Sequence, residues 1–378
     1  MYVVVYMNII GLIAEYNPFH LGHVYHIKKI KEMYPDSLLV CVMSSCFCER
    51  GEVSVLNKWD KTKLCLNNGI DIVIELPFVF SSQSADIFAK GAVGILNAMG
   101  VNKIVFGSES NDIKLLSDIA NLQVNNNKFD TLVKSYLDKG NNYPTSLSLS
   151  LKHFNIKKID SPNDLLGISY IKEIIKNEYN IEPISIKRIN NYHAKEIDNE
   201  IISASLIRKL INDNKDISSY INYDDKIIYR NTNYLDLLKY KVSISKDLSI
   251  YKTVDEGIES RLLKYINDCF SLDDLVSRIK TKRYTYNKIN RMLIHILTDF
   301  KKNDFNNELS YIRVLGFNSN GKKYLNTIKK NVSIPLITNY KSNLYKELDI
   351  EYRVTKIYSL IVKDDSLIKK ELNKPIII

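Results

Sequence analysis

The sequence feature that most constrains the fold is an alternation of short apolar runs with segments of helical spacing over the first 110 residues. The apolar runs typical of strands are residues 9–14, 38–43, 70–75 and 103–106. The segments of helical spacing start near Gly22 and then cover residues 59–67 and 84–99. Strands that alternate with helices predict an α/β fold with a parallel, doubly wound sheet. Ligands bind such sheets at the carboxyl ends of the strands, where His20 and Gly107 fall.

The composition is that of a globular protein. The 378 residues are 45% hydrophobic and 25% charged, which excludes a disordered or collagen-like chain. The longest apolar stretch, residues 70–80, is interrupted by Asp71 and Glu75 and is far shorter than the roughly 20 residues of a membrane span. The N-terminus lacks the basic flank of a signal peptide, and Met7 is an alternative start. We therefore expect a cytoplasmic protein that does not bind membranes.

The five cysteines indicate reduced thiols. Their number is odd, they form no C-x-x-C pair, and no histidine cluster lies beside them. This pattern argues against structural disulfides and against a zinc site. We expect no metal site built by the protein.

Charge divides the chain into two parts. Residues 1–210 carry 23 Lys and Arg against 22 Asp and Glu, whereas residues 211–378 carry 30 against 21. A near-neutral half followed by a basic half suggests chemistry in the first and polyanion binding in the second, against the alternative of a solvated lysine-rich surface.

The pattern of residue types also changes near residues 212–219. Beyond that point apolar residues recur at helical spacing, glycine is scarce, and strand-like runs appear only at 333–337 and 376–378. We therefore predict two domains: residues 1–212, a catalytic domain of Rossmann-like type, and residues 213–378, a mostly helical basic domain.

The strongest functional signal is the run Asn17-Pro18-Phe19-His20-Leu21-Gly22-His23 between the first strand and the first helix. Gly22 allows a ligand to approach the backbone closely, and a helix N-terminus offers free N–H groups to phosphate. His20 and His23 lie three residues apart and can face the same bound group, donating hydrogen bonds as charge builds on it. The alternative, a structural pair of histidines, fits this position less well.

This motif resembles that of the H-x-G-H nucleotidyltransferases, which activate a substrate by attack on the α-phosphate of a nucleoside triphosphate. A second run, Ile202-Ser203-Ala204-Ser205-Leu206-Ile207-Arg208, is similar to the I-S-S-T-x-I-R element of that superfamily. Two residues depart from the general pattern: Ala204 replaces a hydroxyl residue, and Glu15 stands where cytidylyltransferases usually carry Thr or Ser.

The departures fit a narrower family, because residues 11–26 resemble the opening of bacterial tRNA(Met) cytidine acetate ligases. The match continues through about residue 320, with local departures at Ser45 and Glu49. The other runs that carry it include Arg50-Gly51-Glu52, Asp71–Pro77, Phe106–Glu109, Ser161–Gly167 and Lys280–Tyr284. The resemblance implies that ATP and acetate give acetyl-adenylate and pyrophosphate, and that the wobble cytidine of elongator tRNA(Met) is then acetylated at N4.

The resemblance also assigns residues. It makes His20 and His23 catalytic, and it implies Mg²⁺ with the ATP substrate but no dedicated metal site. The implied ATP-binding residues are Ile13, Ala14, Glu15, Tyr16, Asn17, Pro18, Phe19, His20, Leu21, Gly22, His23, Val24, Tyr25, His26, Gly107, Asn163, Arg188 and Ile189. The candidate phosphate-side residues are Arg50, Ser203, Ser205 and Arg208.

Several of these residues also have plainer interpretations. Asn163 follows Ser-Pro and is also suited to cap a helix, and Arg188 is otherwise a surface charge. Lys58 is a weaker phosphate candidate than Arg50. Other residues for which packing is the simpler interpretation are His26, His193 and Trp59.

Residues 276–295 contain six Lys and Arg and no acid. An acid-free basic stretch with aromatic residues suits RNA, since phosphates attract the cations and unstacked bases stack on rings such as Tyr284 and Tyr286. The alternative is a solvated helix face. The predicted tRNA-binding residues are Lys280, Lys282, Arg283, Lys288 and Arg291.

The resemblance therefore implies a ligase that uses free acetate and ATP, not acetyl-CoA. A small-molecule adenylyl- or cytidylyltransferase remains the alternative, although it leaves the basic half without a role. A non-catalytic RNA-binding protein of the same fold is a third interpretation, against which the intact His20 and His23 argue.

Overall fold

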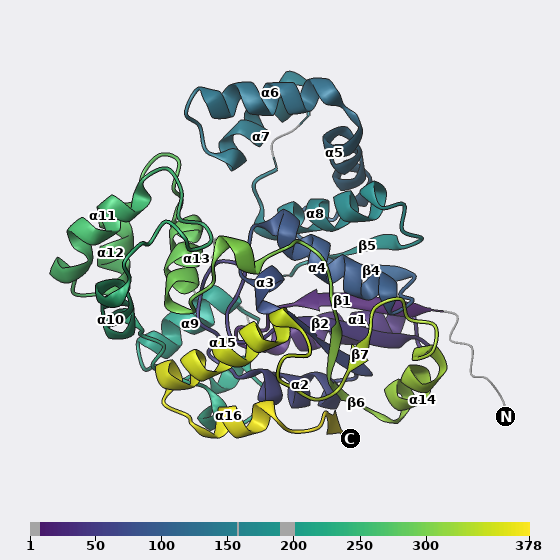
Figure 1. Cartoon of the computed structure of the whole chain (residues 1–378). Helices are drawn as coiled ribbons and strands as arrows, with labels where there is room; N and C mark the ends of the chain where they lie inside the picture. The colour runs from purple at the N-terminus through teal and green to yellow at the C-terminus, as the bar shows by residue number, and fades with distance from the viewer. Residues whose placement is uncertain (1–7, 157–158, 190–200) are drawn as a thin grey trace.

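The structure is a computed structural model that describes residues 8–156, 159–189 and 201–378. Its centre is a sheet (Figure 1) with strand order β5-β4-β1-β2-β3-β6-β7 and with β8 paired to β6. The strands are β1 (Ile9–Ala14), β2 (Leu38–Ser44), β3 (Ile72–Leu76), β4 (Lys103–Ser108), β5 (Glu182–Lys187), β6 (Ile312–Phe317), β7 (Leu336–Ile337) and β8 (Ile376–Ile377). All paired strands are parallel except β3 and β6.

The predicted α/β class and the four predicted strands are confirmed. Every residue of β2 and β3 is buried, as expected for strands covered on both faces of a parallel sheet. The register places Ile9 opposite Leu38 and Val40 opposite Ile72. Because β1 lies between β2 and β4, the chain reverses its winding direction there, and the carboxyl ends of β1 and β4 flank the crevice where such sheets bind ligands.

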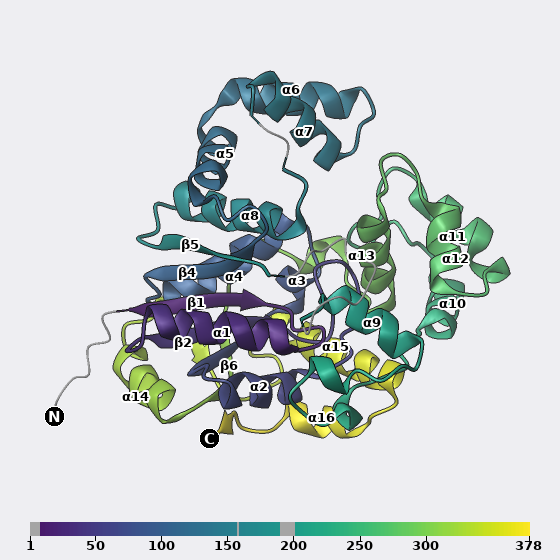
Figure 2. The ribbon, with the colours of Figure 1, turned by 180° about the vertical axis from the view of Figure 1, so that it is seen from behind.

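Helices cover both faces of the sheet. Figure 2 shows α1 in front of β1 and β2, and α4 lies on the opposite face. The helices up to β5 are α1 (Leu21–Met33), α2 (Lys58–Asn67), α3 (Phe78–Ser81), α4 (Ala85–Ala98), α5 (Ile113–Asn125), α6 (Asn127–Asp138), α7 (Tyr143–His153) and α8 (Pro162–Lys176). The predicted end of α4 is confirmed: Gly100 has φ +71° and donates its N–H to Asn97, as a glycine after a helix end does.

The helices α5 to α7 form an arm above the sheet (Figure 1). A second group of helices, from α9 to α13, lies beside the carboxyl ends of the strands. The helices that follow β5 are α9 (Ala204–Asn212), α10 (Leu235–Ile244), α11 (Ile258–Tyr265), α12 (Leu272–Ile279), α13 (Tyr286–Leu297), α14 (Ser319–Ile328), α15 (Lys346–Val362) and α16 (Ser366–Glu371). None of the described helices is long and apolar enough to cross a bilayer.

The last third of the chain differs from the prediction in one respect. Strand segments were expected at 333–337 and 376–378, where β7 and β8 lie, but β6 was not expected. β6 pairs with β3, so residues from beyond position 312 extend the sheet that the first half begins. The sheet therefore does not end at residue 212, although the proposed division of roles between the two halves stays a prediction.

Buried charges stabilise the pairing of β3 with β6. Lys58 Nζ lies 2.5 Å from Glu75 Oε1 and 2.9 Å from the Glu371 carboxylate, and Arg313 contacts both acids. All four side chains are almost fully buried. Because a buried charge is tolerated only when it is paired, these contacts hold α16 against β3 and β6. Lys58 therefore belongs to a structural cluster, and its candidacy as a phosphate ligand is wrong.

Two further expectations concern packing. Trp59 is buried as predicted and lies beneath the Lys58 and Arg313 cations. All five cysteines are buried free thiols, as the sequence indicated.

Candidate active site

A cavity of about 1470 Å³ opens at the carboxyl ends of β1 and β4, and residues of α1, α8, α9 and α13 are among those that line it. It brings together most of the predicted site residues. Those that line it are Ile13, Ala14, Glu15, Tyr16, Asn17, His20, Gly22, His23, Tyr25, His26, Arg50, Gly107, Asn163, Arg188, Ile189, Ser203, Ser205, Arg208, Arg283, Lys288 and Arg291.

Six predicted residues lie outside that lining. Phe19 and Val24 are buried in the hydrophobic core, and Pro18 is also buried. The others are Leu21, Lys280 and Lys282. His193 lies outside the described residues.

Two histidines are held at the start of α1 by backbone hydrogen bonds. His20 is the N-cap of the helix, and its Nδ1 accepts from the Gly22 N–H at 3.0 Å. His23 Nδ1 accepts from the His20 N–H at 3.2 Å. The two rings lie with their centroids 3.9 Å apart. The expectation that both histidines face one site is therefore confirmed in position, and Gly22 is needed because a Cβ there would lie 2.7 Å from the His20 ring.

These bonds fix the protonation of both rings. A backbone N–H only donates, so Nδ1 of each imidazole must be the acceptor and Nε2 carries the proton. Burial lowers the pKa of His20 to about 3, with the Arg188 and Arg208 cations adding to the effect. Burial also lowers the pKa of His23, helped by the neighbouring His20. Both are neutral near pH 7 and offer Nε2–H groups to an anion.

The second predicted motif forms the start of α9. Ser203 caps this helix by accepting from the Leu206 N–H. Arg208, one turn into the helix, donates to the Asn17 carbonyl oxygen at 2.7 Å and pairs with Glu52 at 2.7 Å. The start of α9 thus lies directly against the first motif, and the N-termini of two helices lie at one cavity.

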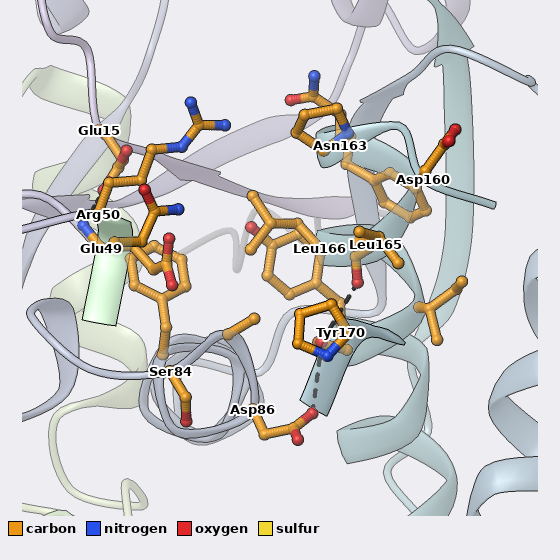
Figure 3. A pocket seen from close by; sticks show the side chains of 18 of the residues that line it. Glu15, Glu49, Arg50, Ser84, Asp86, Asp160, Asn163, Leu165, Leu166 and Tyr170 are labelled. Atoms are coloured by element: carbon orange, nitrogen blue, oxygen red, sulfur yellow. Dashed lines mark hydrogen bonds between the residues drawn. The ribbon is translucent and has the colours of Figure 1, made fainter. Parts of the chain in front are cut away.

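The β4 end of the cavity is formed by Gly107, Arg188 and Asn163. A Cβ on Gly107 would lie 3.3 Å from Arg188 Cγ, so glycine admits the arginine stem. Arg188 lies 3.7 Å from the Glu109 carboxylate, and the Asn163 amide donates to the same carboxylate. Figure 3 shows Asn163 across the cavity from Glu15 and Arg50.

The loop after β2 connects the cavity with α13. The Glu49 N–H donates to Glu15 Oε1 at 2.5 Å, and the Glu49 carboxylate accepts from Arg291 at 2.7 Å. Gly51, at φ +74°, packs so closely on α13 that a Cβ would lie 2.3 Å from the Arg291 backbone nitrogen. Arg291 was predicted to bind tRNA; its guanidinium is instead paired with Glu49 inside the cavity, and its contact with tRNA stays a prediction.

Lys61 supports the backbone of the site from the core, a role that the sequence did not reveal. Its fully buried ammonium donates to the carbonyl oxygens of Glu15, Ser44 and Ser45, at 3.1, 2.6 and 2.9 Å. It therefore ties together the chain segments that leave β1 and β2. Lys58, Lys61 and Cys65 share one face of α2, and two lysines on an apolar face are the signal that could have indicated buried partners.

The basic stretch lies at the rim of the cavity. Lys280, Lys282 and Arg283 are exposed, and Arg283 lines the cavity, as does Lys288. Tyr286 is 52% exposed with Lys280 over its ring, but Tyr284 is only 2% exposed and its hydroxyl bonds the backbone of Asp255. The prediction that Tyr284 stacks on a base is wrong, because the ring fills the core beneath the rim.

His26 belongs to the same helix face as His23. Burial lowers its pKa to about 4, and its Nε2 atom is buried without a hydrogen-bond partner. Within residues 8–156, 159–189 and 201–378, no group of three or more His, Cys, Asp or Glu side chains is arranged to hold a metal ion.

The cavity is suited to bind a small polyanion at the end where α1 and α9 begin. Neutral Nε2–H donors, two helix N-termini and Arg208 converge there, and such groups stabilise charge that builds on phosphate. No covalent nucleophile is needed for that chemistry. The site and the doubly wound sheet together define a nucleotidyltransferase of the H-x-G-H type.

Comparison with known proteins supports this assignment of the protein class. Residues 7–373 match the model of the HIGH Nucleotidyl Transferase family. The chain is 40% identical to the tRNA(Met) cytidine acetate ligase of Caldicellulosiruptor saccharolyticus, with 95% of each chain covered. It is 38% identical to that of Oceanobacillus iheyensis, covering 98% of this chain and 100% of the relative. The chain belongs to the HIGH nucleotidyl transferases and, within them, to the tRNA(Met) cytidine acetate ligase family.

Solved structures show the same fold. Thermotoga maritima TmcAL bound with alpha-thio ATP superposes with a TM-score of 0.87 at 29% identity, covering 98% of this chain and 99% of that chain. The apo form of the same protein gives a TM-score of 0.88 at 27% identity, covering 98% of this chain and all of that chain.

Proposed function

We propose that this chain is an ATP-dependent acetate ligase that forms N4-acetylcytidine at the wobble position of elongator tRNA(Met). The observation that carries the proposal is one cavity with two different ends. Neutral histidines and helix N-termini form one end, and Arg283 together with the start of α13 forms the other. Relatives that match almost the whole chain are named for this activity, and a structural neighbour binds an ATP analogue.

In the first step, the triphosphate of ATP lies at the start of α1. An acetate oxygen attacks the α-phosphorus, the bond to the β-phosphate breaks, and pyrophosphate leaves. The His20 and His23 Nε2–H groups donate to the phosphate oxygens as negative charge builds, and Arg208 closes the α9 side. The adenosine part lies toward Gly107, Asn163, Arg188 and Ile189, which places ribose and base along β4.

In the second step, the N4 amine of cytidine attacks the acetyl carbonyl. The carbon–nitrogen bond forms, the carbon–oxygen bond to the adenylate breaks, and AMP leaves. The tRNA approaches from the segment between α12 and α13, where Lys280, Lys282 and Arg283 are exposed, and from the start of α13, where Lys288 lines the cavity. Holding the reactants in one cavity supplies much of the rate gain, because a bimolecular encounter becomes an internal one.

Mg²⁺ fits this site as a partner of the nucleotide. The described carboxylates near the histidines, such as Glu49 and Glu52, are paired with arginines, so the protein offers phosphate-binding donors and not a cation cage. When bound with ATP, Mg²⁺ neutralises charge on the triphosphate.

The test is to incubate the protein with ATP, labelled acetate and total tRNA and to analyse the nucleosides. We expect labelled N4-acetylcytidine in one tRNA species, dependent on free acetate and accompanied by AMP and pyrophosphate. Labelling from acetyl-CoA without ATP, or a stable adenylylated or cytidylylated small molecule, would refute the proposal and favour the alternative transferase.

A further inference from the structure

We infer that Glu15 is the general base of the second step, a role that rests on the proposed function: its carboxylate takes the proton that the cytidine N4 amine loses. The residue follows β1 directly and lines the cavity. It lies between the histidines at the start of α1 and the loop that contacts the basic helix α13.

Glu15 is held at two points, one on its backbone and one on its carboxyl group. Lys61 donates to its backbone carbonyl oxygen from within the core, and the Glu49 N–H donates to its Oε1. In the part of the chain that the structure describes, no hydrogen bond reaches its Oε2. One oxygen therefore fixes the orientation of the group, and the other remains available to accept a proton from a substrate in the cavity.

His20 and His23 cannot perform this task. Proton acceptance by a neutral imidazole needs a ring nitrogen with a free lone pair. In His20 and His23 the only such nitrogen is Nδ1, and each Nδ1 already accepts a backbone N–H. The same bonds that make these rings good donors to phosphate therefore remove them as bases.

The nearby carboxylates are occupied by arginine partners. An ion-paired carboxylate is a weaker base because the cation favours its charged form. Near Glu15, Glu49 pairs with Arg291 and Glu52 pairs with Arg208. At the β4 end, Glu109 pairs with Arg188. Glu15 has no such ion pair among the described residues.

The proton balance of the step is closed. As the N4–carbon bond forms and AMP leaves with the electrons of the broken carbon–oxygen bond, one N4 proton passes to Glu15. The protonated carboxyl then returns the proton to water once the products leave. No further reactant is required.

The environment of Glu15 matches such a role. Burial raises its pKa to about 7, with further increases from Glu49 and Glu52 and an opposing effect from Arg50. A base is most effective when its pKa lies near the working pH. The charged or titratable groups that surround it are Cys48, Glu49, Arg50 and Glu52 of the loop after β2, Lys61 of α2 and Tyr170 of α8.

The experiment compares wild type with Glu15→Gln, whose amide oxygen can still accept from the Glu49 N–H. Two rates are measured: acetate-dependent ATP–pyrophosphate exchange without tRNA, and single-turnover acetyl transfer to tRNA. We expect transfer to fall at least 100-fold, in line with the usual contribution of a general base. The fold-loss of exchange should be at least 30 times smaller than the fold-loss of transfer. In wild type, transfer should rise with pH through about 7, and in Glu15→Gln this rise should be absent.

Glu173→Gln is the matched control, since Glu173 is a buried carboxyl of α8 whose pKa is also raised by burial but which does not line the cavity. It should leave both rates unchanged. Equal losses of exchange and transfer in Glu15→Gln, or transfer within tenfold of wild type, would overturn the assignment. If wild type itself forms no N4-acetylcytidine, the proposed function fails first and this role falls with it.

Discussion

The two ends of the cavity differ in how their polar groups are held. At the start of α1, His20 and His23 are fixed by backbone hydrogen bonds and kept neutral by burial. On the rim, the side chains of Lys280, Lys282 and Arg283 are exposed to solvent. The first end is built for precise contact with a small ligand, whereas the second offers adaptable charge to a large one.

This contrast suits one cavity to the two reactants of the proposed reaction. Preorganised donors stabilise a transition state because they need not rearrange during the reaction. Surface cations contribute affinity through counterion release and tolerate many geometries. Arg291 lies between the two ends, since it extends from the basic helix but pairs with Glu49 beneath the loop after β2.

The largest expected effect is at the histidine end. His20→Asn should lower acetate-dependent ATP–pyrophosphate exchange at least 100-fold, because asparagine keeps the helix cap but not the Nε2–H donor. His23→Ala should act in the same direction. Binding of tRNA, measured by filter retention, should stay within about twofold of wild type. Exchange within tenfold of wild type, about 1.4 kcal/mol of barrier, would remove the assigned role.

A second expected effect is on the salt dependence of tRNA binding. Changing Lys280, Lys282 and Arg283 together to Gln should weaken binding and lower the slope of log K against log salt by about two units, at roughly 0.7 per phosphate contact. Exchange without tRNA should remain. Lys264→Gln with Lys330→Gln provides a control at other surface lysines. An unchanged slope would mean that the rim is only solvated surface.

The smallest expected effect is on stability against pH. The folded protein holds His20 neutral with a pKa of about 3, whereas the unfolded chain protonates it near 6.5. Stability is therefore present above about pH 6.5 and is lost as the pH falls toward 3. Urea unfolding at pH 7.5 and 5.0 should show that wild type loses more than His20→Asn, by about 2 kcal/mol. Parallel losses would mean that the fold does not lower this pKa.

Much of the fold could be predicted from the sequence because its strands are continuous apolar runs. β6 could not, because its sequence includes Arg313 and Gly316. The arginine is tolerated there only through Glu75 and Glu371, which are far away in the sequence. Local pattern carries no information about such pairing.

In the candidate site too, features that depend on local sequence could be predicted, and features that depend on distant partners could not. The histidine motif could be predicted because its chemistry depends on neighbours within a few residues. The Glu49–Arg291 pair and the contacts of Lys61 could not, since their partners come together only when separate elements pack. The same reason explains Tyr284, whose aromatic character does not reveal that its ring is buried.

The central claim is that acetate attacks the α-phosphate of ATP at the histidine end and that cytidine is acetylated by the resulting adenylate. The most direct measurement uses acetate labelled with ¹⁸O at both oxygens in the complete reaction with tRNA. Attack by acetate at phosphorus leaves one acetate oxygen bridging to the adenylate, so AMP should carry one ¹⁸O for each N4-acetylcytidine formed. AMP without the label, formed together with acetylated tRNA, would contradict the account.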